Sequence, residues 1–124
     1  MLVDDRFKEG LKLFNEKDYF ECHEVIEDLW LATPADDPHR DLYKGVIQAA
    51  AAIYQFGRGI LSGAQGLYKT AVDYLEKYKP HALGLNVDKL IRDLKQCFGE
   101  LESWDGRRTV RRREYLTPVL EYTP

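Results

Sequence analysis

The side chains best suited to chemistry lie in one short segment, YFECHEVIEDLW, at residues 19–30. His23 and Glu27 are four residues apart, so on a helix they lie on the same face, one turn apart, and can meet. An imidazole nitrogen and a carboxylate on one face are ligands that divalent transition metals accept. Glu24 can add a third ligand or a general base. The pattern makes His23 and Glu27 candidate metal ligands, and Glu24 and Glu27 candidate catalytic residues.

The segment matches known metal motifs only in part. The H-E-x-x-E pattern differs from the H-E-x-x-H of zinc proteases, because Glu27 stands where the second histidine ligand belongs. Di-iron bundles take E-x-x-H from two helices, and this sequence has no second copy. A divalent transition metal is therefore one hypothesis for this segment beside a structural one.

The structural interpretation is a buried polar network that fixes helix register. Trp30 lies beside His23 on such a helix, so we expect His23 and Glu27 to be partly buried. Buried polar groups need partners, and Lys44 and Gln48 of a later segment are placed to supply them. We favour this network, with His23, Trp30, Lys44 and Gln48 as the candidate binding residues.

Helical periodicity runs through most of the sequence, and no stretch alternates apolar and polar residues long enough to predict a strand. Capping residues and prolines divide this pattern into helices. We predict five: residues 4–16, residues 19–32 capped by Asp18, residues 37–56 with Asp37 as cap and Pro38 first, a fourth that Ser62 caps and Pro80 ends, and a fifth that Asn86 caps and residues 104–106 end. The fold class is therefore all-α, a single-domain bundle.

The third helix should lie at the centre, since it is apolar on most sides and has only a narrow polar strip that includes Lys44 and Gln48. We assign residues 1–106 to the helical bundle domain and residues 107–124 to an arginine-rich extended tail. Leu116, Val119 and Leu120 are the tail residues expected to pack on the bundle.

Charge argues against a nucleic-acid partner. The 18 lysines and arginines against 21 acids give a net charge of −3, which excludes a generally basic nucleic-acid binder. Residues 107–113 carry five arginines, which makes RNA binding a third hypothesis, but the acidic stretch 18–41 is an obvious partner for them within the chain or a dimer. We therefore do not expect nucleic acid to bind.

The cysteines and the first residues indicate location. Cys22 and Cys97 are the only cysteines, which favours reduced thiols over a disulfide framework. The opening residues are acidic where a signal peptide would be basic, and the longest apolar stretch, residues 46–54, is too short for a bilayer. We expect a cytoplasmic protein with no membrane association.

Taken together, these motifs resemble domain-of-unknown-function family 309. The resemblance rests on F-x-x-G-x-x-L-F at residues 7–14, on H-E-x-x-E-x-x-W at residues 23–30 and on K-G-x-I-Q at residues 44–48. It implies an all-helical, partly open bundle from a small bacterial or archaeal protein, and no established activity. The family's motif residues fall here on His23, Glu24, Glu27, Trp30, Lys44, Gly45 and Gln48.

Two functions of different class remain for this uncharacterised chain. The favoured one is a small helical interaction module that binds a protein partner or a second copy of itself, suggested by tyrosines that could lie at the surface: Tyr68, Tyr74, Tyr78, Tyr115 and Tyr122. The alternative is a metal-dependent or acid–base enzyme, hydrolase-like, that uses His23, Glu24 and Glu27 with Gln48 orienting a ligand.

Overall fold

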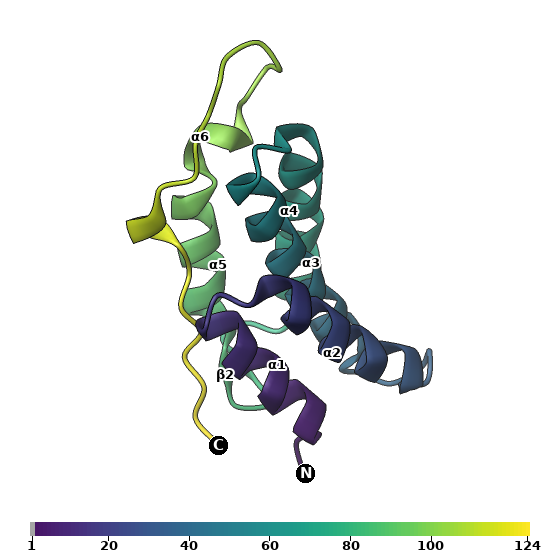
Figure 1. The fold of residues 1–124 in the computed structure, drawn as a ribbon. Coiled ribbons are helices and arrows are strands. Elements are labelled where there is room, and N and C mark those ends of the chain that lie inside the picture. The colour runs from purple at the N-terminus through teal and green to yellow at the C-terminus, as the bar shows by residue number, and fades with distance from the viewer. Residues whose placement is uncertain (1) are drawn as a thin grey trace.

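Helices make up most of residues 2–124, the part of the chain that the computed structural model describes (Figure 1). The elements, in chain order, are α1 (Asp5–Asn15), α2 (Tyr19–Ala32), α3 (Arg40–Gly57), α4 (Leu61–Glu76), β1 (His81–Ala82), β2 (Leu85–Asn86), α5 (Val87–Cys97), α6 (Gly99–Glu102) and the 3₁₀ turn η1 (Glu114–Leu116). The prediction of an all-α bundle is confirmed.

α3 is the central element. It packs against α2 on one side and α4 on the other, while α1 pairs with α2 and α5 with α4. Apolar side chains from most of its circumference are buried, as the sequence predicts, and the run of alanines at residues 49–52 keeps its surface narrow where neighbours approach. The position of α3 therefore fixes both helical pairs.

Side-chain caps form at the starts of α1 and α5, whereas the expected caps Asp18 and Ser62 do not form. The Asp4 side chain accepts a hydrogen bond from the Arg6 N–H at the start of α1, and the Asn86 side chain accepts one from the Lys89 N–H at the start of α5. α3 begins two residues later than predicted, because Asp37 accepts from the His39 N–H at 2.8 Å and holds a turn before the helix.

Two features of the second half differ from the prediction. The predicted fifth helix is interrupted at Phe98, so that it forms α5 and the short α6. A two-residue hairpin joins β1 to β2, with positive φ angles at Leu83 (49°) and Gly84 (84°). Hairpins of this kind favour Asn-Gly, so the Leu-Gly pair gave no clear signal for a strand.

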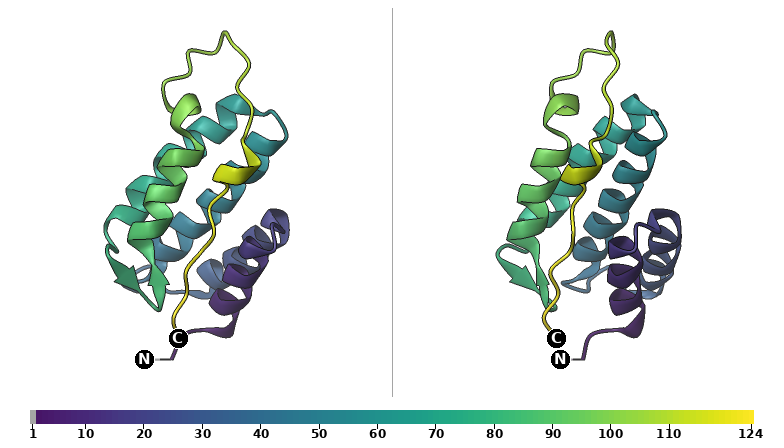
Figure 2. Two further views of the ribbon diagram at one scale, coloured as in Figure 1. Left: turned by 90° about the vertical axis from the view of Figure 1, so that its left-hand side faces the viewer. Right: turned by 60° about the vertical axis from the view of Figure 1, so that its left-hand side comes forward.

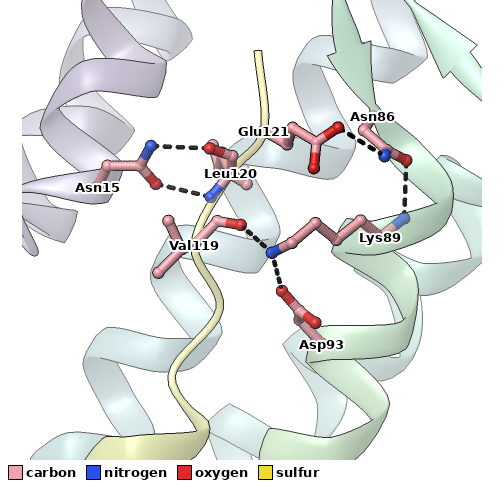
Figure 3. A network of polar contacts seen from close by, with 7 residues as sticks. All are labelled: Asn15, Asn86, Lys89, Asp93, Val119, Leu120 and Glu121. Atoms are coloured by element: carbon pink, nitrogen blue, oxygen red, sulfur yellow. Dashed lines mark hydrogen bonds and ion pairs between the residues drawn. The ribbon is translucent and has the colours of Figure 1, made fainter.

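The C-terminal segment is extended, as predicted, and lies between α1 and α5 (Figure 2). Asn15 of α1 binds both backbone groups of Leu120, donating to its carbonyl at 2.9 Å and accepting from its N–H at 2.7 Å (Figure 3). On the other side, Lys89 of α5 donates to the carbonyl of Val119 at 2.7 Å. Leu120 is buried, Leu116 is half-buried and Val119 is exposed, so one of the three residues expected to pack does so fully.

Two glycines mark the closest helix crossings. A methyl group on Gly10 of α1 would lie 2.2 Å from Cγ1 of Ile26 in α2. A methyl group on Gly45 of α3 would lie 2.8 Å from Cδ2 of Leu75 in α4. Both glycines belong to the motifs noted in the sequence, so these motifs encode helix packing as well as any chemistry.

Replacing Gly10 by alanine should therefore destabilise the fold. The new methyl group would overpack a fully buried contact with Ile26, which costs about 1–3 kcal/mol, although alanine favours the helix. Gly66 in α4 has no neighbour within 4 Å, so Gly66→Ala should stabilise by about 0.5–1 kcal/mol. Urea unfolding of both variants measures the difference, and equal effects would contradict the packing role of Gly10.

The Asn15 bonds predict a second effect on stability. Asn15→Ala leaves both Leu120 backbone groups without this partner, and should lower the free energy of unfolding by about 1–3 kcal/mol. Lys12→Ala, on an exposed side chain of the same helix, should change it by less than about 0.5 kcal/mol. If chemical denaturation found the two variants alike, the tail would not be held by Asn15.

Candidate functional site

The α2 helix presents two different faces. Its inner face is buried and consists of Tyr19, Cys22, Ile26 and Leu29. Trp30, which follows Leu29, is only half-buried. The outer part of the helix carries the H-E-x-x-E residues.

The structure brings the three candidate ligands together. His23 Nε2 lies 3.5 Å from Glu27 Oε2, and the two side chains are 34% and 38% exposed. Glu24 is exposed, and one ligand atom from each of the three residues lies within 4.8 Å of the other two. Metal–ligand bonds of about 2.0–2.2 Å place two donor atoms up to about 4 Å apart. Side-chain rotations alone can therefore bring these three donors to one ion.

The predicted network around His23 is confirmed only in part: His23 and Glu27 meet and are partly buried, but the partners expected from α3 are wrong. No polar or charged residue in the described range 2–124 is fully buried, and neither Lys44 nor Gln48 reaches His23 or Glu27 through a hydrogen bond or ion pair. Gln48 instead accepts a hydrogen bond from the Thr70 hydroxyl of α4. The reason is geometric: α3 lies between two helices, and this part of its polar strip turns toward α4 and not toward α2.

Lys44 has a different role, at the end of α2. Its Nζ lies 4.3 Å from the centre of the Trp30 ring, and the guanidinium carbon of Arg40 lies 4.1 Å from the same ring centre. Arg40 also donates from Nε to the Thr33 carbonyl at 3.2 Å. These contacts join the C-terminal end of α2 to the first turns of α3. Sequence reasoning missed Arg40, although it stands one helical turn before Lys44.

A small pocket of about 190 Å³ adjoins His23 between α2 and α3. Aromatic side chains form much of its wall, and the Phe20 and Tyr54 ring centres lie 6.1 Å apart. Burial raises the pKa of Tyr19 to about 12, so its phenol stays protonated near neutral pH. The lining residues are Tyr19, Phe20, His23, Ala51, Tyr54 and Gln55. No local pattern predicts this pocket, because a helical wheel of one helix cannot show which side chains the next helix contributes.

The thiols are placed for structure and not for nucleophilic chemistry. Both cysteines are free and buried. Burial raises the pKa of Cys22 to about 12 and that of Cys97 to about 11, so neither is a thiolate near neutral pH.

The tyrosines do not form one surface. Tyr68 is 1% exposed, stacks on Phe98 with ring centres 4.6 Å apart, and donates its hydroxyl to Glu102 at 2.9 Å. Its assignment as a surface tyrosine is therefore wrong. Tyr115 is exposed, whereas Tyr74, Tyr78 and Tyr122 are half-buried.

Comparison with known proteins addresses the same segment. The model of a family described as a domain of unknown function (DUF309) matches residues 7–67. This match confirms the predicted resemblance over these residues. They include the whole of α2 and α3, and with them every motif residue on which the resemblance rests. The DUF309 segment thus contains the candidate site but ends well before the arginine-rich tail.

Two curated relatives of this chain are described as uncharacterised proteins. An uncharacterised protein, YpuF, of Bacillus subtilis (strain 168) is 29% identical over 96 residues, which are 76% of this chain and 55% of that protein. An uncharacterised protein of Aquifex aeolicus (strain VF5) is 24% identical over 95 residues, 77% of this chain and 28% of that protein. The chain thus spans about half or less of the length of these relatives, and no solved structure matches it.

Membrane insertion through a helix has no support in the described part of the chain. Within residues 2–124, no helix is both long enough and apolar enough to cross a bilayer.

The partly exposed position of Glu27 predicts that neutralising this side chain has a small effect on stability. The Glu27→Gln variant loses one partly exposed contact with His23, so the free energy of unfolding should fall by less than about 1 kcal/mol. Asp28→Asn, one residue further along, is the control for charge. In thermal and urea unfolding, both variants should have a free energy of unfolding close to that of the parent. A loss above about 2 kcal/mol for Glu27→Gln alone would instead support the buried network.

Proposed function

We propose that the outer face of α2 binds a divalent transition metal through His23, Glu24 and Glu27. The observation that carries the proposal is the approach of three ligand atoms to within 4.8 Å of one another at the surface. In the described chain, His23 and Glu27 form an ion pair only with each other, and Glu24 forms none. These side chains can therefore turn toward an ion without breaking contacts that hold the fold.

The donor set indicates which ions suit the site. One imidazole nitrogen and two carboxylate oxygens are compatible with Zn²⁺, Mn²⁺ and Fe²⁺, whereas a purely oxygen site would favour Mg²⁺ or Ca²⁺. Three protein ligands also leave coordination positions open, as in catalytic zinc sites. The pocket beside His23 is then a place where a small, partly aromatic ligand could reach the ion.

An enzyme built on this site would be a metal-dependent hydrolase. His23 and Glu27, one turn apart, would hold the ion. Exposed Glu24 would serve either as the third ligand or as the general base toward a bound water, and not as both. Gln48, assigned by sequence to orient a ligand, is engaged with Thr70 of α4, so this role falls instead to residues of the pocket wall such as Tyr54.

Metal titration of untagged, chelator-stripped protein tests the binding proposal. Calorimetry with Zn²⁺ and with Mn²⁺ should find one equivalent per chain for at least one ion, abolished by His23→Ala. His81→Ala is the matched control, since His81 is an exposed histidine of β1 and is not among the three clustered donors of α2. Absence of binding, or an equal loss in the His81 variant, would contradict the site.

The interaction-module function remains a second candidate because of two exposed apolar residues on the same helix. Phe20 is 50% exposed and Leu31 is 66% exposed. Positions 20, 24, 27 and 31 share one helix face, so these two side chains flank the carboxylates. Sedimentation of the protein with and without Zn²⁺ separates the candidates: self-association abolished by Phe20→Ser with Leu31→Ser would support an interface, and a monomer throughout would contradict self-association.

A further inference from the structure

A groove lies at the end of the molecule opposite the C-terminus, away from the site on α2. Its walls are the turn that joins α3 to α4 and the projecting loop that follows α6, two segments that Figure 2 shows. The groove has a volume of about 690 Å³. No acidic residue lines it, whereas five arginines do, together with Phe56, Leu61 and Trp104 as its large apolar side chains. The arginines are Arg58, Arg107, Arg108, Arg111 and Arg112.

Four of these arginines lack an acidic partner within residues 2–124. Arg112 pairs with Glu114 and donates to the Ile53 carbonyl at 3.2 Å, which fixes it at the end of α3. Arg108 donates only to the backbone carbonyl of Glu100, and Arg58 only to the Tyr54 hydroxyl. Arg107 and Arg111 form no side-chain hydrogen bond or ion pair there. Their charges therefore add in one groove.

Within residues 2–124, the acidic residues that lie near these arginines in the sequence bind other groups, so none of them forms an ion pair with the four unpaired arginines. Each is bound by another residue: Glu100 by Arg113, Glu102 by the Tyr68 hydroxyl, Asp105 by the backbone N–H of Arg107, and Glu114 by Lys17 and Arg112. The acidic stretch 18–41, expected from sequence to neutralise the arginines, pairs with none of those in the groove. This corrects the expectation for pairing within the chain.

The loop that carries the arginines is held in place by the bundle. Gln65 of α4 donates from Nε2 to the carbonyls of Leu101 at 2.9 Å and Trp104 at 3.1 Å. The Trp104 indole N–H donates to the Arg108 carbonyl at 2.6 Å. These bonds hold the backbone of the loop that carries the arginines before any ligand arrives. A preformed loop lowers the entropy lost on binding.

We infer that this groove binds a phosphate-bearing ligand of about nucleotide size. Guanidinium groups bind phosphate oxygens through paired, charge-assisted hydrogen bonds, and four of them are free to do so here. The volume lies in the range of small-molecule sites, about 300–1,000 Å³, and Trp104 adds an aromatic surface for a base. The same phosphate chemistry is present in a free nucleotide and in single-stranded RNA, which the test must separate.

The experiment compares tripolyphosphate, ATP and an oligouridylate as probes, by calorimetry on the full chain at about 50 mM salt, because phosphate binding weakens steeply with salt. The test variant is Arg107→Gln with Arg111→Gln, since these side chains hold nothing in the fold. Lys69→Gln with Arg92→Gln is the control: both side chains are exposed, neither forms an ion pair in residues 2–124, and the net charge changes equally.

Binding of at least one probe, weakened at least about tenfold in the test variant and unchanged in the control, is expected. Tighter binding of ATP than of tripolyphosphate would assign a nucleotide. Binding of the oligouridylate alone, with a salt dependence reduced by about one charge per arginine removed, would assign RNA. Absence of binding to all three probes, or equal weakening in the control variant, would overturn the inference. Neither outcome depends on the metal proposal, because no α2 residue lines the groove.

Discussion

The close approach of helices in the first half of the chain is the constraint on which the rest of the structure depends. Gly10 lets α1 lie directly on Ile26 of α2, and Gly45 lets α3 lie directly on Leu75 of α4. Because α3 packs against both α2 and α4, these two crossings bring four helices together around one apolar core. The tail then fills the remaining gap between α1 and α5 (Figure 3).

This packing explains why the polar motif faces outward. Burial of the inner face of α2 against α1 and α3 uses Ile26 and its neighbours, so His23 and Glu27 are left at the rim of the helix with about a third of each side chain exposed. The cations that could have neutralised them are occupied elsewhere, since Arg40 and Lys44 lie against Trp30. A histidine nitrogen and two carboxylates within 4.8 Å of one another are donors that a cation can use. The DUF309 motif thus joins packing residues, such as Gly45, to residues that the packing does not use.

Much of the fold could be predicted from the sequence, because local signals decide it. The start of α5 follows from Asn86, whose side chain caps it, and the bounds of α2 agree with the predicted 19–32. What failed depended on neighbours in space. A helical wheel gives the polar strip of α3 but not which helix it faces, so Gln48 was placed toward α2 when it turns to α4. The arginine groove joins Arg58 to residues some fifty positions later, a proximity that no local pattern records.

The central claim, that the surface of α2 is a metal-binding face, is tested most directly at the histidine nitrogens. The chain has three histidines, so a long-range ¹H–¹⁵N spectrum of the imidazoles during a Zn²⁺ titration reads each of them separately. The account predicts that the ring nitrogens of His23 shift on saturation at one equivalent while those of His39 and His81 stay in place. Unchanged His23 resonances, or shifts spread equally over all three histidines, would contradict it.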